Sequence, residues 1–242
     1  MTRGVVQHVE HTIGAPATAT RPPARPAVRP GGDPAPSAGL LETAVRYAQE
    51  RHWDVLPGTW LEDVDGGRRC SCGDPACPAP GAHPTRPDWP GQATGSGAAV
   101  RRMWAREPRA SILLPTGRVF DAIDVPEVAG CLALARMERM DLPLGPVLCT
   151  PTRRLVFLVL PGATAKVPDL LRRLGWPPAS LDLVVRGDGD YVAAPPTRMS
   201  GTGHVQWARH PGAVNRWLPD AEELLSPLAY ACGREAAAQR GR

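Results

Sequence analysis

The stretch Ser111–Pro126, which reads SILLPTGRVFDAIDVP, constrains the fold of this chain more than any other feature. It holds two β-prone apolar runs separated by Thr116-Gly117, a dipeptide typical of a turn, and Pro126 ends the second run. These features predict two short strands followed by a helix that begins at Pro126. With 242 residues, 43% of them hydrophobic, the chain is long enough for one sizeable domain with its own core.

Two carboxylates, Asp121 and Asp124, lie on the second of these runs. Carboxylates on a short hydrophobic strand in mid-domain are typical of a divalent-metal or acid/base site. A purely structural interpretation stays open beside this one. In that interpretation Asp121 lies at the edge of the strand and Asp124 caps the helix that follows.

Residues 66–92 form a long insertion without hydrophobic periodicity, and it contains the pattern C-x-C-x4-C-x5-H. A loop of this length inside a domain is usually functional or held together by a ligand. Three thiolates and an imidazole are a ligand set of tetrahedral structural zinc sites. We therefore predict a zinc-stabilised loop, with three reduced surface thiols as the alternative. The predicted zinc ligands are Cys70, Cys72, Cys77 and His83.

Composition divides the chain into a Pro/Ala-rich tail at residues 1–37, predicted to be disordered, and one domain at 38–242. The tail has too little apolar mass to offset the entropy cost of ordering it. The formal net charge of +4 is mild and does not by itself indicate nucleic-acid binding. Because no apolar run approaches the roughly 20 residues of a membrane span, we expect a soluble, cytoplasmic protein that makes no membrane contact.

Hydrophobic periodicity predicts the remaining elements. Helices are expected at residues 40–51, 98–105, 126–140, 167–174 and 220–239, the last kinked or split by Pro227. Strands are expected at residues 53–57, 112–114, 119–125, 145–149, 155–160, 181–185, 191–194 and 204–207. In the helix at 126–140 the core positions are predicted to be Val128, Leu132, Ala135 and Met140, with Cys131 as a small buried hydrophobic residue.

From about Leu40 to Trp207, the order of these features resembles the N-terminal domain of bifunctional DNA primase/polymerases, the prim-pol branch of the archaeo-eukaryotic primase superfamily. The CSCGDPAC…GAHP loop and the segment LDLVVRGDGDYVAAPPT are its most specific parts. The resemblance implies an α+β fold with an RRM-like mixed-sheet core and flanking helices. It also implies two-metal nucleotidyl transfer with Mg²⁺ or Mn²⁺, nucleoside triphosphates and a DNA template.

The family's active site uses a D-x-D or D-x-E strand, a His in the second motif and an Asp in the third. This chain has Asp121-Ala-Ile-Asp124 in the first motif, Leu155 where the His falls, and Asp182 in the third. Because strand side chains alternate, D-x-x-D places its two carboxylates on opposite faces unless a bulge intervenes. The candidate catalytic residues are Asp121, Asp124 and Asp182, and the candidate nucleotide-binding residues are Arg153, Arg154 and Arg186.

Three functions are compatible with this pattern. The first is a catalytically degenerate prim-pol domain that binds a nucleotide or nucleic acid in DNA replication or a related process. The second is an active DNA primase/polymerase whose metal ligands are shifted. The third is a non-catalytic scaffold that keeps the fold and binds a protein partner.

Overall fold

The computed structural model describes residues 1, 36–64, 66–200, 203–212 and 217–241. The predicted tail lies outside these residues, except for Met1 and for Pro36 and Ser37, which already belong to the first helix. Residues 34–242 form one compact unit of mixed α+β structure, as the sequence predicts. Its helices are α1 (Pro36–Arg51), α2 (Gly97–Arg106), α3 (Glu127–Arg139), α4 (Ala163–Arg173) and α5 (Ala221–Arg240).

A five-stranded sheet forms the centre of this unit, with the strand order β12-β6-β7-β5-β8 and antiparallel pairing throughout. Its strands are β5 (Asp121–Pro126), β6 (Val147–Thr150), β7 (Arg154–Val159), β8 (Val184–Arg186) and β12 (Gln206–Arg209). The second predicted run of the opening stretch is therefore β5, and it pairs with β7 on one side and β8 on the other.

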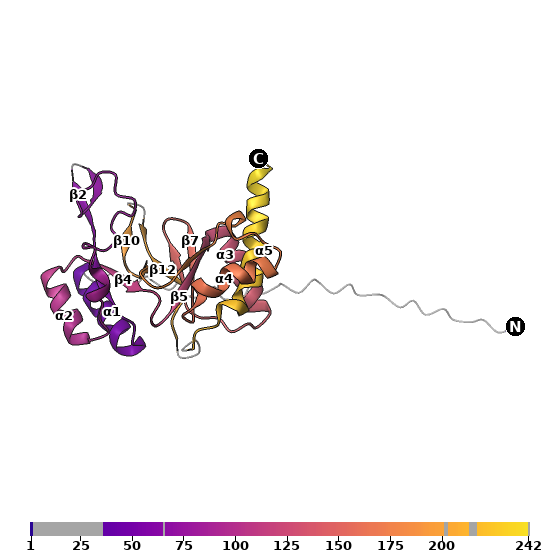
Figure 1. Cartoon of the computed structure of the whole chain (residues 1–242), viewed down its shortest axis with the longest axis horizontal. Coiled ribbons are helices and arrows are strands. Elements are labelled where there is room, and N and C mark those ends of the chain that lie inside the picture. The colour runs from indigo at the N-terminus through magenta and orange to yellow at the C-terminus, as the bar shows by residue number, and fades with distance from the viewer. Residues whose placement is uncertain (2–35, 65, 201–202, 213–216, 242) are drawn as a thin grey trace. The chain divides into compact units, whose positions relative to one another are not determined.

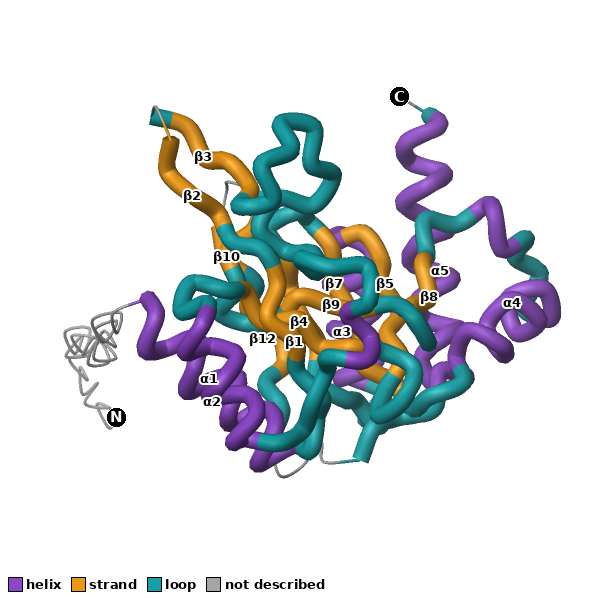
Figure 2. The backbone as a smooth tube through the Cα atoms, turned by 60° about the vertical axis from the view of Figure 1, so that its left-hand side comes forward, coloured by secondary structure: helices purple, strands orange, loops and turns teal. Residues whose placement is uncertain are grey.

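Both faces of this sheet are covered, so its alternating side chains enter two different cores. Ile123 and Val125 on β5 pack with residues of α3, α4 and α5. Ala122, which points the other way, packs with residues of α1 and α2. Figures 1 and 2 both show the sheet between these two groups of helices. Burial on both faces explains why β5 reads as a nearly continuous apolar run.

Smaller sheets flank the central one. A three-stranded sheet has the order β1-β4-β9, and the pairs β2-β3 and β10-β11 are two-stranded. Their strands are β1 (Leu56–Gly58), β2 (Leu61–Val64), β3 (Gly67–Cys70), β4 (Ser111–Pro115), β9 (Tyr191–Ala193), β10 (Arg198–Met199) and β11 (Gly203–His204). Short 3-10 turns occur at Trp89–Gly91 and Pro178–Ser180.

The packing of α3 differs from the prediction, although its bounds agree with it. Val128, Leu132 and Met140 are exposed by 48%, 53% and 54%, and Cys131 is exposed as well. The buried residues are Ala129, Gly130, Ala133 and Met137. Small residues face the sheet because the helix lies close to it. A Cβ at Gly130 would come within 2.6 Å of Leu155 Cβ.

Other boundaries shift for identifiable reasons. The strand predicted at 53–57 begins only at Leu56, and the strand predicted at 181–185 is Val184–Arg186, because Leu181 turns into the core. Pro227 does not split α5, which stays continuous because its apolar face is buried. None of the helices in the described residues is long and apolar enough to cross a membrane.

Candidate metal centre and candidate active site

The four predicted zinc ligands converge in the structure. The Sγ atoms of Cys70, Cys72 and Cys77 and a ring nitrogen of His83 all lie within 4.8 Å of one another. The distance from Cys70 Sγ to His83 Nε2 is 3.4 Å, close to the edge of roughly 3.5 Å expected in a tetrahedron with zinc-like bond lengths. We call these four residues the Cys/His cluster. Together they could hold a metal ion such as zinc.

Tight turns bring the ligands together. Cys70 ends β3, and the amide of Gly73 (φ +80°) donates to the Cys70 carbonyl. Gly81 also has a positive φ, +79°, and its amide donates to Cys70 Sγ at 3.3 Å. A Cβ on Gly81 would lie 2.7 Å from the carbonyl oxygen of Arg198. Glycine is therefore required at 81 both for backbone conformation and for space.

His83 is oriented as a metal ligand. Its Nδ1 lies 2.8 Å from the Pro84 carbonyl oxygen, which can only accept, so Nδ1 carries the proton. The lone pair of Nε2 then faces the thiols, the arrangement in which histidine binds metals. The buried hydroxyl of Thr59 accepts from the His83 amide and donates to the Cys70 sulfur. Thr59 thus holds two of the four ligands, a role that the spacing of the ligands did not reveal.

The thiols of the Cys/His cluster differ in acidity. Burial alone would raise the pKa of Cys70, but hydrogen bonds from the Thr59 hydroxyl and the amides of Cys72 and Gly81 lower it to about 6. Burial raises the pKa of Cys77 to about 11, and the neighbouring Cys72 and Cys70 add to that effect. Negative charge therefore concentrates on Cys70. A divalent cation at the centre would favour the remaining thiolates.

The second site lies on the face of β5 that carries Asp124. Asp124 is 5% exposed, and two arginines from the neighbouring strands bind its carboxylate. Arg154 on β7 donates from Nε to Oδ1 at 2.7 Å. Arg186 on β8 donates from Nε and Nη2 to Oδ2 at 3.2 and 2.9 Å. Both carboxylate oxygens are thus already occupied by guanidinium donors.

Each of these arginines also binds an outer carboxylate. Arg154 Nη1 donates to both oxygens of Asp182 at 2.8 and 2.7 Å, and Arg186 Nη1 contacts both oxygens of Asp190 at 3.3 and 3.2 Å. We call these five residues the Asp124 network. Burial alone would lower the pKa of both arginines, but the carboxylates outweigh it and raise the pKa. Three carboxylates and two guanidinium groups give the network a net charge of −1.

Asp121 lies on the opposite face of β5 and binds different groups. Its Oδ2 accepts hydrogen bonds from the amides of Gly162 and Ala163 at 3.0 and 2.8 Å. These amides form the N-terminus of α4, which therefore begins four residues before the predicted start at Val167. Asp121 Oδ1 is buried and has no hydrogen-bond partner among the described residues. The carboxylate expected at a strand edge is instead a helix cap supplied from β5.

Asp124, which the structural interpretation placed at the start of α3, does not cap that helix. The N-cap of α3 is Pro126, which makes no side-chain cap hydrogen bond. The amide of Ala129, in the first turn of α3, donates to Glu235 of α5 instead. The structural interpretation therefore gave the capping role to the wrong aspartate. The helix-capping one is Asp121, and it caps α4.

The register identifies which side chains could act together with Asp124. Pro126 and Asp124 share a face because they are two residues apart on β5. On β7, Arg154 lies opposite Pro126, whereas Leu155 lies opposite Val125 and is buried on the helix side. On β8, Val184 lies opposite Asp124. Arg154 therefore shares the face of Asp124 and Leu155 does not, and no second carboxylate projects beside Asp124 from β5 or β8.

These residues do not fit a centre for two divalent cations. Such a centre needs carboxylates that converge on both ions, about 3.5–4 Å apart. Asp121 is on the other face, and Asp182 precedes β8 with its side chain 61% exposed and bound to Arg154. Arg153 lies outside the Asp124 network, because it pairs with Glu127 and is 76% exposed.

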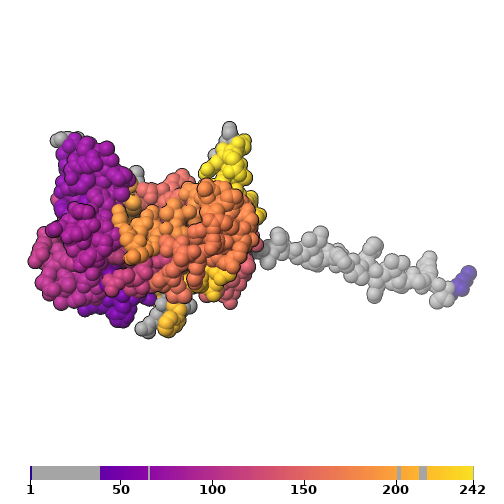
Figure 3. Space-filling view, in the orientation of Figure 1, coloured from indigo at the N-terminus to yellow at the C-terminus, as the bar shows by residue number. Residues whose placement is uncertain are grey.

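Tyr191 is within electrostatic reach of both the Cys/His cluster and the Asp124 network. This residue follows Asp190, and its ring meets Trp89 edge-on at a centroid distance of 5.6 Å. Burial and then the Asp190 charge raise the pKa of Tyr191, and both Arg186 and Cys77 are within electrostatic reach. In Figure 3 the β2–β3 region and the end of α5 project on the same side, and the surface between them is recessed.

Comparison with models of known protein families gives a match that covers both sites. The model of the bifunctional DNA primase/polymerase N-terminal domain (Prim-Pol) matches residues 44–223, which is most of the chain. No curated protein and no solved structure matches the chain significantly. The matched range includes the central sheet, the Cys/His cluster and the whole Asp124 network. The chain belongs to the bifunctional DNA primase/polymerase N-terminal domain family.

Proposed function

We propose that this protein is a Prim-Pol domain that does not transfer nucleotides and instead binds phosphate groups of a nucleotide or nucleic acid through Arg154 and Arg186. The observation that carries the proposal is the occupancy of Asp124 by these two guanidinium groups. Each arginine places positive charge beside the Asp124 carboxylate, at the position where a catalytic metal ion would otherwise bind. The process served would be DNA replication or a related one.

Phosphate binding requires the outer carboxylates to give way. Asp182 and Asp190 are exposed by 61% and 36%, so water and salt screen their attraction to the arginines. Asp124 is 7% exposed at its side chain and holds both guanidinium groups in place. A multiply charged phosphate can therefore replace an outer carboxylate on each arginine and gain fork-like hydrogen bonds.

A scaffold function is the second candidate, and the same network favours it. Each guanidinium group already has two carboxylate partners, and in this second candidate the role of the network is to join β7, β5 and β8. In that case the protein would act through a protein partner. The Cys/His cluster fits both candidates, because a closed set of four ligands is typical of structural zinc.

Calorimetric titration of the protein with ATP, in the absence of divalent metal, separates the two candidates. Asp182→Asn keeps the shape of an exposed side chain and removes the charge that competes with phosphate. If Arg154 binds phosphate, this variant should bind ATP about five- to tenfold more tightly than wild type, and binding should weaken as salt rises. Arg154→Ala should abolish the gain. The absence of ATP binding in both wild type and Asp182→Asn would favour the scaffold.

A further inference from the structure

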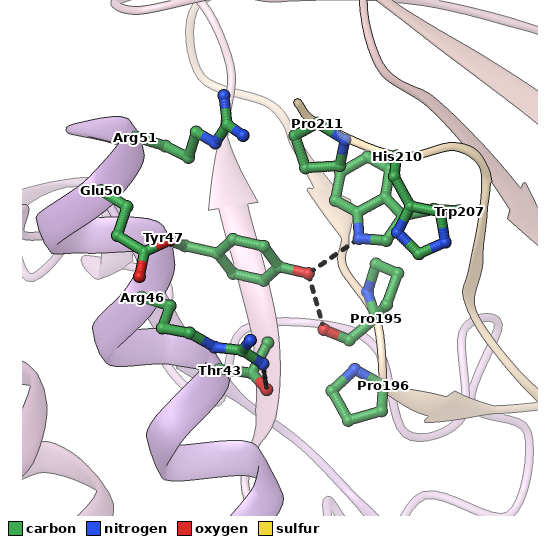
Figure 4. Close-up of a pocket in the computed structure, with 10 residues that line it drawn as sticks. All are labelled: Thr43, Arg46, Tyr47, Glu50, Arg51, Pro195, Pro196, Trp207, His210 and Pro211. Atoms are coloured by element: carbon green, nitrogen blue, oxygen red, sulfur yellow. Dashed lines mark hydrogen bonds between the residues drawn. The ribbon is translucent and has the colours of Figure 1, made fainter. Parts of the chain in front are cut away.

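A cavity of about 340 Å³ lies between α1 and the segment that carries β12. Figure 4 shows its lining, with Arg46, Tyr47, Glu50 and Arg51 from α1 facing the prolines and Trp207 of the opposite wall. None of its lining residues belongs to the Cys/His cluster or to the Asp124 network. Its volume is at the lower end of the range typical of small-molecule sites, roughly 300–1,000 Å³.

One wall of the cavity is flat and largely apolar. It is lined by the half-buried Trp207 and the rings of Pro195, Pro196 and Pro211, and His210 adds one polar ring. The polar edges of the aromatic residues are already paired, because Trp207 Nε1 donates to the Tyr47 hydroxyl at 3.1 Å and that hydroxyl donates to the Pro195 carbonyl at 3.0 Å. Burial raises the pKa of Tyr47 to about 12, so the phenol stays protonated. What this wall offers a ligand is therefore ring surface.

The other wall carries positive charge. Arg46 donates to the Thr43 hydroxyl at 3.2 Å and Arg51 to the Gly212 carbonyl at 3.1 Å, and both acceptors are neutral. Neither arginine makes an ion pair with a carboxylate among the described residues. Glu50 is the one acidic residue in the lining, so the two arginines leave a net positive charge. An anion with a flat ring fits both walls.

We propose that this cavity binds a phosphate-bearing nucleobase, with the base against Trp207 and the prolines and the phosphate against Arg46 and Arg51. Aromatic side chains beside positive charge are a combination by which proteins bind the nucleotides of an unpaired strand. The ligand is either a free nucleotide or one unit of a single strand. This site is separate from Arg154 and Arg186 and does not depend on the proposed function.

The test measures binding of a fluorescein-labelled oligo-dT of about 12 nucleotides to the full chain by anisotropy, with dTMP as competitor. The double variant Arg46→Ala/Arg51→Ala should bind the oligonucleotide about tenfold more weakly than wild type. Trp207→Leu should weaken it as well, provided that its thermal unfolding shows a folded protein. Arg102→Ala, which removes an exposed arginine of α2 outside the cavity, should bind as wild type does.

Competition by dTMP identifies the source of the ligand. If dTMP displaces the oligonucleotide, the cavity takes a free nucleotide, and if it does not, the cavity takes a unit of a strand. Arg154→Ala removes an arginine of the proposed function, so a loss of oligonucleotide affinity that is larger in Arg46→Ala/Arg51→Ala than in Arg154→Ala would assign the binding to the cavity. Wild-type affinity in the Arg46→Ala/Arg51→Ala variant, an equal loss in Arg102→Ala, or no oligonucleotide binding by wild type would each overturn the proposal. The first result leaves the proposed role of Arg154 untouched.

Discussion

The Cys/His cluster and the Asp124 network are assembled in opposite ways. The cluster takes its four ligands from residues 70–83, within one loop. The network takes Asp124, Arg154 and Arg186 from three neighbouring strands, and its outer carboxylates from the segments around β8. A metal site of the first kind depends on local turns. A charge network of the second kind depends on strand register, because a shift of one strand by a single residue would move its side chains to the other face of the sheet.

The largest effect is expected from breaking the cluster. Cys72→Ser should lower the bound zinc from about one ion per chain to near zero and loosen residues 66–92, because metal binding and loop folding are coupled. Elemental analysis measures the zinc, and hydrogen exchange measures the loop. Cys131→Ser, an exposed thiol on α3 outside the cluster, should keep its zinc. Protein purified without chelator that contains no metal would contradict the prediction.

The network should respond more strongly to loss of its centre than to loss of a surface ion pair. Asp124→Ala leaves the guanidinium groups of Arg154 and Arg186 facing each other without their shared carboxylate, at a cost of about 3 kcal/mol in the free energy of unfolding. Urea denaturation measures this change in the free energy of unfolding. Arg172→Ala, which breaks an exposed pair with Asp169 on α4, is the matched control and should change stability little. An Asp124→Ala effect no larger than that of the control would show that the network is not structural.

A smaller effect is expected at the other aspartate of β5. Asp121→Asn keeps the shape of the side chain but removes the negative charge at the N-terminus of α4, which should cost about 1 kcal/mol. The amides of Gly162 and Ala163 should then exchange faster with solvent. Asp169→Asn, on the exposed side of α4, should leave those amides unchanged. Unchanged exchange in Asp121→Asn would show that Asp121 does not cap the helix.

The smallest effect concerns the segment before α1. Because α1 begins at Pro36, we predict that residues 2–34 are dispensable for both the cluster and the network. Their deletion should shift the melting temperature by no more than about 2 °C, which is under about 1 kcal/mol for a chain of this size. The zinc content should also stay the same. A large drop in melting temperature would mean that this segment packs on the domain.

Local chemistry was therefore easier to predict from the sequence than pairing between strands. The convergence of Cys70, Cys72, Cys77 and His83 followed from spacing and turn residues, and the structure confirms that they meet. The α+β fold was implied by the resemblance to the primase/polymerase family, and the opposite faces of Asp121 and Asp124 followed from strand alternation. These inferences needed no knowledge of which strands are neighbours.

Inferences that needed strand neighbours were the weaker ones. The sequence suggested Leu155 at the second-motif position, but only the pairing of β5 with β7 shows that Arg154 shares the face of Asp124. Likewise, only the pairing with β8 reveals Val184 opposite Asp124. The exposed Val128 and Leu132 of α3 were misassigned to the core because the close approach of Gly130 to the sheet has no signature in hydrophobicity.

A second carboxylate beside Asp124 should give the network the metal binding that the Cys/His cluster is expected to have. Asp is a favoured N-cap residue, so Pro126→Asp should be tolerated at the start of α3 and place a second carboxylate on the face of Asp124. Combined with Val184→Asp, it should bind Mn²⁺ more tightly than wild type, as electron paramagnetic resonance can measure. Leu132→Asp, at an exposed position of α3, should not. Equal Mn²⁺ binding by wild type and the combined variant would show that the network already accepts a divalent cation.

If the Asp124 network cannot hold two catalytic metals, the wild-type protein should not transfer nucleotides. Incorporation of radiolabelled dNTPs should be measured on primed and unprimed templates with Mg²⁺ and with Mn²⁺, beside Asp124→Ala, Asp121→Ala and Asp182→Ala. Wild type should incorporate no more dNTP than Asp124→Ala does. Robust template-dependent extension by wild type that is lost in the aspartate variants would contradict this expectation and establish an active primase/polymerase.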